Sequence, residues 1–240
     1  KQQVSTVILE RFKYSIVLML VAWCFSGIVG FLIGVLAGIY KGSLFDKIVK
    51  IFCLALQSAP TFWIGLLILS LFSVYLGWFP IGFAVPMGKL SLEITIWDRI
   101  YHLILPALTL SILGISRVTL FTRQKLIEIL NSDFILFAKA RGENTRQLVI
   151  RHGLRNIELP AITEQFASFS ELFGGIALAE TVFSYPGLGT ATTAAGLNGD
   201  VPLLLGIAIF SAIFVFVGNF IANILYGVLD PRLKEGKYNG

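Results

Sequence analysis

The chain has 240 residues, of which 56% are hydrophobic and only 14% are charged, and its formal net charge is +5. With a mean hydropathy of +0.81, this composition excludes an ordinary soluble domain, which needs more charge to cover its surface. The positive charge does not indicate nucleic-acid binding, because the basic residues lie in short segments between apolar runs, as membrane topology demands. The two cysteines lie inside apolar runs and the two histidines are far apart, so the sequence indicates neither a disulfide framework nor a metal site.

Five apolar runs are long enough to cross a bilayer as helices, which takes about 20 residues each. The predicted spans are residues 14–40, 48–76, 101–121, 157–181 and 203–229. The fourth is the weakest, because it carries glutamates. Pro60 predicts a kink or a broken turn in the second span. The fold class expected is therefore all-α, a polytopic transmembrane helical bundle in which residues 1–240 form a single domain.

Basic residues mark one side of the predicted bundle. Lys41, Lys47 and Lys50 follow the first span, seven bases lie in the segment 122–156, and Arg232, Lys234 and Lys237 follow the last span. These segments share one side if the spans alternate, and the positive-inside rule makes that side cytoplasmic, together with the C-terminus.

The N-terminal charges conflict with this count. Five spans with a cytoplasmic C-terminus place Lys1 outside, although Lys1, Arg11 and Lys13 favour the inside. We therefore expect a sixth, N-terminal span that precedes this chain, with a true five-span protein as the alternative.

The segment 122–156 is long for a loop of a helical membrane protein and contains signals of ordered structure. Asn131-Ser132-Asp133 can cap a helix, and Asn144-Thr145 can begin a second. Between them, Phe134, Phe137, Ala138 and Arg141 recur at helical spacing. An apolar ridge beside basic residues suits docking into a groove of a partner protein. It equally suits an amphipathic helix that lies on anionic lipid.

Motifs along nearly the whole chain resemble those of a known family. Ala138-Lys139-Ala140-Arg141-Gly142, then Arg151-His152-Gly153-Leu154-Arg155-Asn156 and Leu159-Pro160, look like the cytoplasmic loop of ABC importer permeases. Further matches are Gly42-Ser43-Leu44-Phe45-Asp46, Ser58-Ala59-Pro60-Thr61-Phe62-Trp63, Leu76-Gly77-Trp78-Phe79-Pro80, the run from Glu180 to Gly189, Asp200-Val201-Pro202 and Leu229-Asp230-Pro231-Arg232. Their order and spacing resemble the first of the two paired permeases in the dipeptide/oligopeptide/nickel transport family.

The resemblance implies a fold like that of type I ABC importer permeases and a division of labour. This subunit would lie in the bacterial cytoplasmic membrane, in contact with lipid. It would pair with a homologous permease, two cytoplasmic ATPase subunits and an extracytoplasmic solute-binding protein. The chain has no GxxxxGK[ST] phosphate loop. It is therefore expected to be a transport subunit and no enzyme, with no cofactor of its own, while ATP and Mg are bound by its partners.

The resemblance also implies that the cytoplasmic coupling loop, residues 122–156, carries a helix seated in an ATPase. The coupling candidates are Phe137, Ala138, Ala140, Arg141, Gly142 and Arg146. Phe137 occupies the position of the family's leading acid, so an acidic coupling contact is not implied. Gly142 is expected to end the helix with a positive φ, with ordinary loop flexibility as the alternative.

Polar residues at membrane depth are costly, about 2.5–3.5 kcal/mol each for charges on insertion scales, and therefore need partners or water. Glu164, Ser168 and Glu171 are spaced to share one face of a helix over 157–181. They are candidates for the translocation path, where the glutamates could bind a cationic part of the cargo. The alternative is structural pairing with Arg117, Arg123 or a partner residue.

Glu180, Tyr185 and Pro186 are candidates for an external gate. Glu180 could cap the turn that contains Tyr185 and Pro186, or it could simply reach water at the interface. An aromatic belt at the outer interface is predicted from Trp78, Trp97, Tyr101 and Tyr185. Gly27, Gly30, Gly34 and Gly38 predict close packing of the first span against a neighbour.

Three other functions compete with ATP-driven import: an ion-driven secondary transporter, an intramembrane enzyme and a structural subunit. We find no inverted repeat of the kind typical of secondary transporters. No histidine or aspartate joins the membrane-depth glutamates to form a catalytic constellation. Within the importer family, peptides are the favoured cargo, and nickel or a metal chelate is the main rival.

Overall fold

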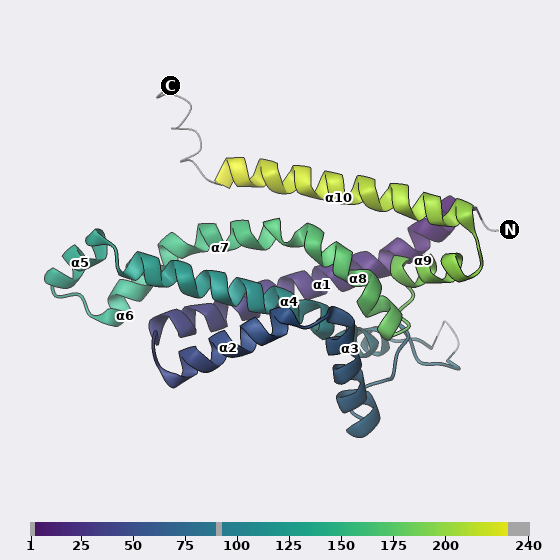
Figure 1. Cartoon of the computed structure of the whole chain (residues 1–240), viewed down its shortest axis with the longest axis horizontal. Coiled ribbons are helices and arrows are strands. Elements are labelled where there is room, and N and C mark those ends of the chain that lie inside the picture. The colour runs from purple at the N-terminus through teal and green to yellow at the C-terminus, as the bar shows by residue number, and fades with distance from the viewer. Residues whose placement is uncertain (1–2, 90–92, 230–240) are drawn as a thin grey trace. The chain divides into compact units, whose positions relative to one another are not determined.

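The computed structural model describes residues 3–89 and 93–229, and within these ranges every regular element is a helix (Figure 1). The helices are α1 (Val4–Ile39), α2 (Leu44–Ser58), α3 (Thr61–Leu69), α4 (Ile96–Leu130), α5 (Asp133–Ala140), α6 (Thr145–Gln147), α7 (Arg155–Ala167), α8 (Phe169–Val182), α9 (Leu188–Leu197) and α10 (Val201–Leu229). Two π-helical stretches, Ser70–Tyr75 and Leu148–Leu154, continue α3 and α6. The predicted all-α class is confirmed.

Three helices of the described chain are long and apolar enough to cross a membrane: Val4–Ile39, Ile96–Leu130 and Val201–Ala222. They match the first, third and fifth predicted spans. The second predicted span qualifies only when α2 is joined to the helix Thr61–Tyr75. The break falls at Pro60, which is the N-cap of α3, as expected from its missing N–H donor.

The fourth predicted span is not one continuous helix. α7 ends at Ala167 and α8 begins at Phe169, and Ser168 between them has a ψ of −7°. The Ser168 hydroxyl donates a 2.8 Å hydrogen bond to the Gln165 carbonyl, which satisfies one of the carbonyl groups exposed where α7 ends. The assumption of an unbroken helix through Glu164, Ser168 and Glu171 was therefore wrong.

The chain divides into two compact units, and the division cuts the long helices rather than the loops. Unit 1 comprises residues 1–24, 59–113 and 170–217, and unit 2 comprises residues 25–58, 114–169 and 218–240. Unit 2 contains two of the three segments that the sequence predicts on the basic side, residues 41–50 and 122–156. The third, with Arg232, Lys234 and Lys237, lies outside the described residues, as does most of the motif Leu229-Asp230-Pro231-Arg232.

Gly30, Gly34 and Gly38 of α1 pack against α4 within unit 2, whereas Gly27 faces Gln165 of α7. A Cβ atom on Gly30 would lie 2.8 Å from Val118 Cβ, and one on Gly34 would lie 2.7 Å from both the Thr119 carbonyl oxygen and Thr122 Cβ. The Thr119 hydroxyl donates a 3.2 Å hydrogen bond to the Gly30 carbonyl. These distances confirm close packing, with the neighbour being a helix of the same chain.

A buried ion pair ties α2 to α4 in unit 2. Asp46, 3% exposed, accepts hydrogen bonds from Arg123 Nε and, at 2.8 Å, from Arg123 Nη2. It also accepts a 2.8 Å bond from the backbone N–H of Gly42, whose φ is +82°. The guanidinium of Arg123 and the Gly42 N–H thus satisfy the buried Asp46 carboxylate, which precedes the charge-free part of α2.

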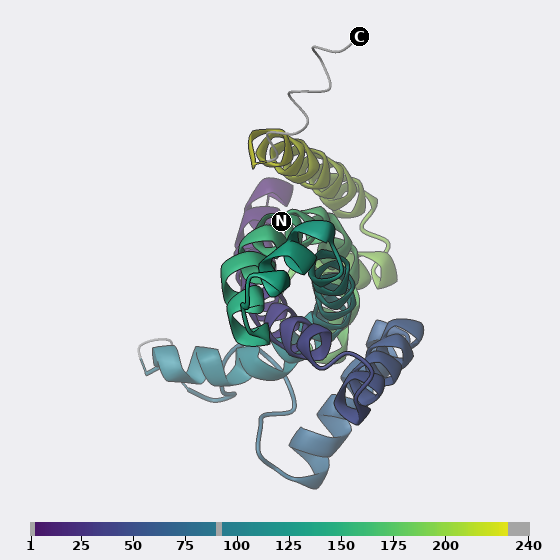
Figure 2. The ribbon, with the colours of Figure 1, turned by 90° about the vertical axis from the view of Figure 1, so that its left-hand side faces the viewer.

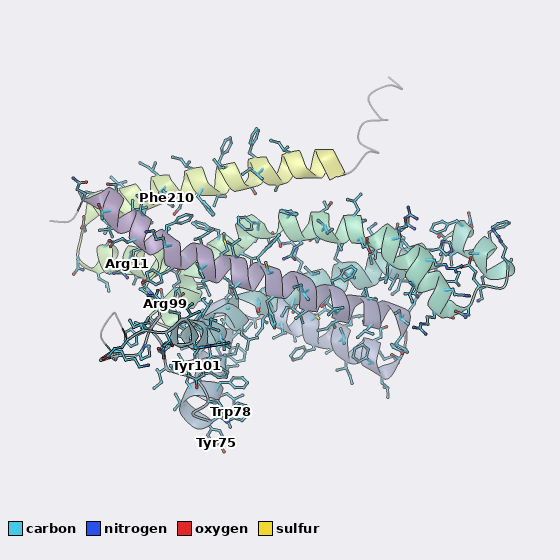
Figure 3. All side chains as sticks on the ribbon, turned by 180° about the vertical axis from the view of Figure 1, so that it is seen from behind. Arg11, Tyr75, Trp78, Arg99, Tyr101 and Phe210 are labelled. Atoms are coloured by element: carbon cyan, nitrogen blue, oxygen red, sulfur yellow. The ribbon has the colours of Figure 1, made fainter. Side chains whose placement is uncertain are left out.

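Unit 1 is held together by apolar contacts of α1 with α9 and α10. Ile8, Leu188, Ala191 and Ile207 form a buried cluster. Phe12 of α1 packs edge-on against Phe210 and Phe214 of α10, with ring centroids 4.9 and 5.0 Å apart. Phe210 is labelled in Figure 3.

Unit 1 also contains the segment after Tyr75. This segment is anchored by a hydrogen bond that the Tyr101 hydroxyl donates to the Trp78 carbonyl.

Replacing Gly34 with alanine should destabilise the chain, because the added methyl group meets the backbone of α4. Overpacking of this kind costs about 1–3 kcal/mol. Gly174→Ala is the matched control, because nothing lies within 4 Å of a Cβ atom there. That change should be neutral or slightly stabilising. Thermal denaturation of the detergent-solubilised chain measures both variants, and equal melting temperatures would contradict the close packing.

Candidate functional site

The predicted coupling loop folds into α5, α6 and the π-helical stretch Leu148–Leu154, all in unit 2. Figure 1 shows α5 and α6 beyond the ends of α4 and α7, and Figure 2 views unit 2 from that end. α5 begins after Ser132, where the sequence predicted a cap. The cap itself differs from the prediction, since the Ser132 hydroxyl donates back to the Ile129 carbonyl at 2.5 Å.

Gly142 ends α5 as the sequence predicted. Its φ is +90°, a conformation that glycine adopts without the steric cost of a Cβ atom. The N–H of Gly142 donates to the Lys139 carbonyl at 3.0 Å, and the N–H of Glu143 donates to the Ala138 carbonyl at 3.3 Å. This pair of bonds is the Schellman arrangement.

The second predicted helix start is also confirmed, at Asn144. Its side chain accepts from the Gln147 N–H at 3.0 Å, and the Gln147 side chain accepts from the Asn144 N–H at 2.9 Å, which is a reciprocal capping box. Beside it, His152 Nε2 lies 3.1 Å from a carboxylate oxygen of Glu143. The end of α5 and the start of α6 are thus fixed by local hydrogen bonds.

α5 has one buried face and one exposed face. Ile135, 2% exposed, and Ala138 pack against Leu148. The exposed side carries Phe134, Leu136, Phe137, Ala140 and Arg141, which we call the outer face of α5. Phe137 is 67% exposed. Ala138 was expected on the exposed ridge, and this was wrong because it fills the contact with Leu148.

The other coupling candidates, Gly142 and Arg146, are also exposed. Gly142 lies in the turn that ends α5, and Arg146 lies in α6. The structure therefore places every coupling candidate except Ala138 on the surface of unit 2.

Leu126 connects this loop to the long helices of unit 2. It is fully buried on α4. A Cβ atom on Gly38 of α1 would lie 2.9 Å from Leu126 Cδ2, and one on Gly153 of the π-helical stretch would lie 3.0 Å from Leu126 Cδ1. One side chain therefore fills the space between two glycines, one in α1 and one in the loop.

The path candidates have separate surroundings. Glu164 accepts a 2.7 Å hydrogen bond from Arg117 Nε, so the pairing alternative describes its state in this structure. Ser168 is buried at the end of α7. Glu171 is exposed and lies in the first turn of α8, in unit 1.

Glu180 is a fully buried carboxylate at the centre of the predicted gate. It accepts from the Ser15 hydroxyl at 2.5 Å and from the Gly189 N–H at 2.6 Å. The Ser15 oxygen in turn accepts from the Leu188 N–H at 2.8 Å. The sequence left open whether Glu180 caps this turn or reaches water. In the structure it caps the turn, because its buried carboxylate binds an N–H group at the N-terminus of α9.

The turn fits tightly around this carboxylate. A Cβ atom on Gly187 would collide with the Glu180 side chain, and one on Gly189 would collide with Ala177. Tyr185 is 4% exposed and packs edge-on against Tyr14, with ring centroids 6.0 Å apart. Tyr185 was thus wrongly placed in the aromatic belt, whereas Trp78, Trp97 and Tyr101 are exposed as predicted. Pro186 is half-buried in the same turn.

Two residues of these sites were not singled out from the sequence. Ser15 is one of two serines in the apolar run 14–40, and nothing in its spacing indicates that it bridges Glu180 and Leu188. Asp46 was named only as the last residue of the motif that begins at Gly42. Its acid charge beside Gly42 was the available signal for a turn-capping role.

Glu180→Ala should destabilise unit 1, because the Ser15 hydroxyl and the Gly189 N–H lose their acceptor in a buried site. Each unsatisfied buried group costs about 1–3 kcal/mol. Glu180→Gln, which keeps one acceptor oxygen, should lose less. Melting temperatures of the two purified variants show which one loses more stability. A melting temperature of Glu180→Ala equal to that of the native chain would refute the capping role.

The contributions of Arg117 and Glu164 to thermal stability should depend on each other. Replacing either with alanine leaves the other without its 2.7 Å partner, whereas the exchanged pair Arg117→Glu with Glu164→Arg retains opposite charges. The exchanged double variant should recover part of the thermal stability that the single reversals lose. Additive losses in the double variant would show that the pair is not coupled.

The comparisons with known proteins cover most of the chain. Residues 30–235 match the model of the family described as binding-protein-dependent transport system inner membrane component. The oligopeptide transport system permease protein AppB of Bacillus subtilis (strain 168) is 36% identical over 231 residues, 96% of this chain and 72% of that protein. The dipeptide transport system permease protein DppB of Escherichia coli (strain K12) is 32% identical over 245 residues, 95% of this chain and 72% of that protein.

A solved structure shares the fold. A chain of the MetNI methionine ABC transporter, in inward-facing conformations, superposes with a TM-score of 0.72 over 94% of this chain and 97% of that chain, at 16% identity. The family match covers well over half of the residues, and it includes the loop with α5 and the Glu180 turn. The chain belongs to the family of inner-membrane components of binding-protein-dependent transport systems.

Proposed function

We propose that this chain is a membrane-spanning permease subunit of an ATP-driven peptide importer, and that the outer face of α5 couples it to an ATPase. The observation that carries the proposal is the similarity to two curated permeases whose names specify oligopeptides and dipeptides, each over at least 95% of this chain. Nickel, the rival cargo in the sequence analysis, has no comparable support among these relatives.

The coupling role is supported by the construction of the loop. α5 presents two large exposed aromatic side chains, Phe134 and Phe137, beside the cation Arg141. Its end is fixed by the Gly142 turn and its inner face by Ile135 and Ala138. A short apolar ridge held in one conformation loses little entropy on docking, which favours a protein groove over a bilayer surface.

The assembly proposed for this subunit follows from its family. A homologous permease completes the path, an extracytoplasmic binding protein delivers cargo, and two ATPase subunits bind ATP and Mg on the side of the basic loops. That side is proposed to be cytoplasmic, together with the C-terminus, because seven bases lie in the segment 122–156.

The remaining site residues take roles around the path. Glu180, with Tyr185 and Pro186, is proposed to hold the external gate in shape, since its carboxylate fixes the first turn of α9. Glu164 is proposed to act in the path through its ion pair with Arg117, and Ser168 to permit a break between α7 and α8 beside Glu171.

Phe137→Asp should abolish docking of the ATPase subunits, because it places a charge in the centre of an apolar contact. Loss of such an anchor costs about 2 kcal/mol or more, which weakens association at least tenfold. Copurification of the ATPases with the tagged permease pair measures this.

Leu197→Asp is the matched control. Leu197 is 85% exposed and lies between the fourth and fifth predicted spans, on the proposed external side. ATPases should copurify with this variant as with the native chain. Normal ATPase docking to Phe137→Asp would refute the assignment of α5.

A further inference from the structure

Unit 1 contains a small cavity that the proposed gate and coupling roles do not explain. Its volume is about 330 Å³. The lining comes from α1, from the start of α4, from Ala84 and from Tyr185 of the Glu180 turn. Apolar side chains, among them Ile96, Ile100 and Leu103, form most of its wall.

Two cations line this apolar cavity. Lys13 comes from α1 and Arg99 from the first turn of α4, and Arg99 is labelled in Figure 3. No carboxylate lines the cavity, and no ion pair among the described residues involves either cation. Lys89, by contrast, is paired with Asp98 at 3.0 Å. Two like charges beside one cavity without an acid favour an anionic occupant.

The positive-inside rule does not explain why Lys13 and Arg99 are basic. Both belong to segments that the basic loops place on the outer side of the membrane, where lysine and arginine are not enriched. Topology therefore does not account for these two charges, and the cavity that they share supplies the explanation.

The floor of the cavity is fixed by contacts that do not involve its cations. Tyr185 packs against Tyr14. Ala84 follows Phe83, whose N–H donates to the Phe183 carbonyl at 2.9 Å. The Gly82 carbonyl lies 2.8 Å from His102 Nδ1. The cavity is therefore formed without a ligand, which lowers the cost of binding one.

We propose that this cavity binds the C-terminal residue of a peptide, with the carboxylate between Lys13 and Arg99 and an apolar side chain against Tyr14, Tyr185 and Ile100. Arginine and lysine both form charge-assisted bonds to a carboxylate, and arginine can do so with two donors. A volume of about 330 Å³ lies at the lower end of ligand pockets, about 300–1,000 Å³. This suits one or two residues better than a phospholipid with two acyl chains. The assignment rests on the proposed peptide import, and it specifies which end of the cargo this subunit recognises.

The test uses the assembled complex of both permeases and both ATPases in phosphatidylcholine nanodiscs, without the binding protein or nucleotide. The probe is radiolabelled Ala-Phe, and the competitor is its C-terminal amide. Saturable binding of Ala-Phe that the amide fails to displace is expected. Lys13→Gln and Arg99→Gln should each weaken that binding at least about tenfold, while Lys13→Arg should retain it.

Arg11→Gln is the matched control. Arg11 carries the same charge on the same helix but does not line the cavity, since residues two apart point to different sides of a helix. Its binding of Ala-Phe should equal that of the native chain. Absence of saturable binding, equal competition by the amide, or native affinity of both glutamine variants would overturn the inference.

Two further measurements separate the alternatives. If phosphatidylglycerol in the nanodisc displaces Ala-Phe through Lys13, the cavity is a lipid-phosphate site and the peptide assignment is wrong. Uptake of Ala-Phe into proteoliposomes supplied with the binding protein is measured in parallel. Uptake without direct binding overturns only this inference, whereas a complex that imports no peptide overturns the proposed function itself.

Discussion

The contact of Leu126 with two glycines is the constraint on which unit 2 depends. Gly38 of α1 and Gly153 of the loop both leave room for this side chain, and a Cβ atom on either would meet it at 3.0 Å or less. α4 therefore carries α1 on one side and the α5-bearing loop on the other. Because packing in a protein interior transmits displacement instead of absorbing it, a force on α5 has a direct route to the helices that cross the membrane.

The hydrogen bonds of each unit follow from the same need to satisfy polar groups without water. In lipid an unpaired backbone or side-chain group is costly, so such groups find partners within the protein. Asp46 in unit 2 binds both Arg123 and the Gly42 N–H. Glu180 in unit 1 binds Ser15 and Gly189. Each carboxylate fixes a turn next to a helix start, Asp46 at α2 and Glu180 at α9.

Much of this arrangement could be predicted from the sequence, where a local pattern determined it. Apolar runs gave three spans that the structure has as long helices, and a second span that it has as a bent pair broken at Pro60. Gly142 marked the end of α5 through its backbone freedom, and Asn144 marked the start of α6 through its capping side chain. Ser168 could not be predicted as a helix break, because serine also continues helices. Nor could the burial of Ala138 and Tyr185, since each depends on a neighbour distant in sequence, Leu148 for one and Tyr14 for the other.

In transport, α5 and the part of α1 that belongs to unit 2 should move together. This joint motion is tested by the distance between spin labels at Lys41 and Lys139, both exposed in unit 2, with Cys24 and Cys53 replaced by serine. The distance is measured by electron–electron double resonance in the complete complex, with and without ATP. Joint motion should give one narrow distribution that nucleotide leaves unchanged. A shift or a second population on ATP binding would contradict it, because α5 would then move independently of the helix that it is said to drive.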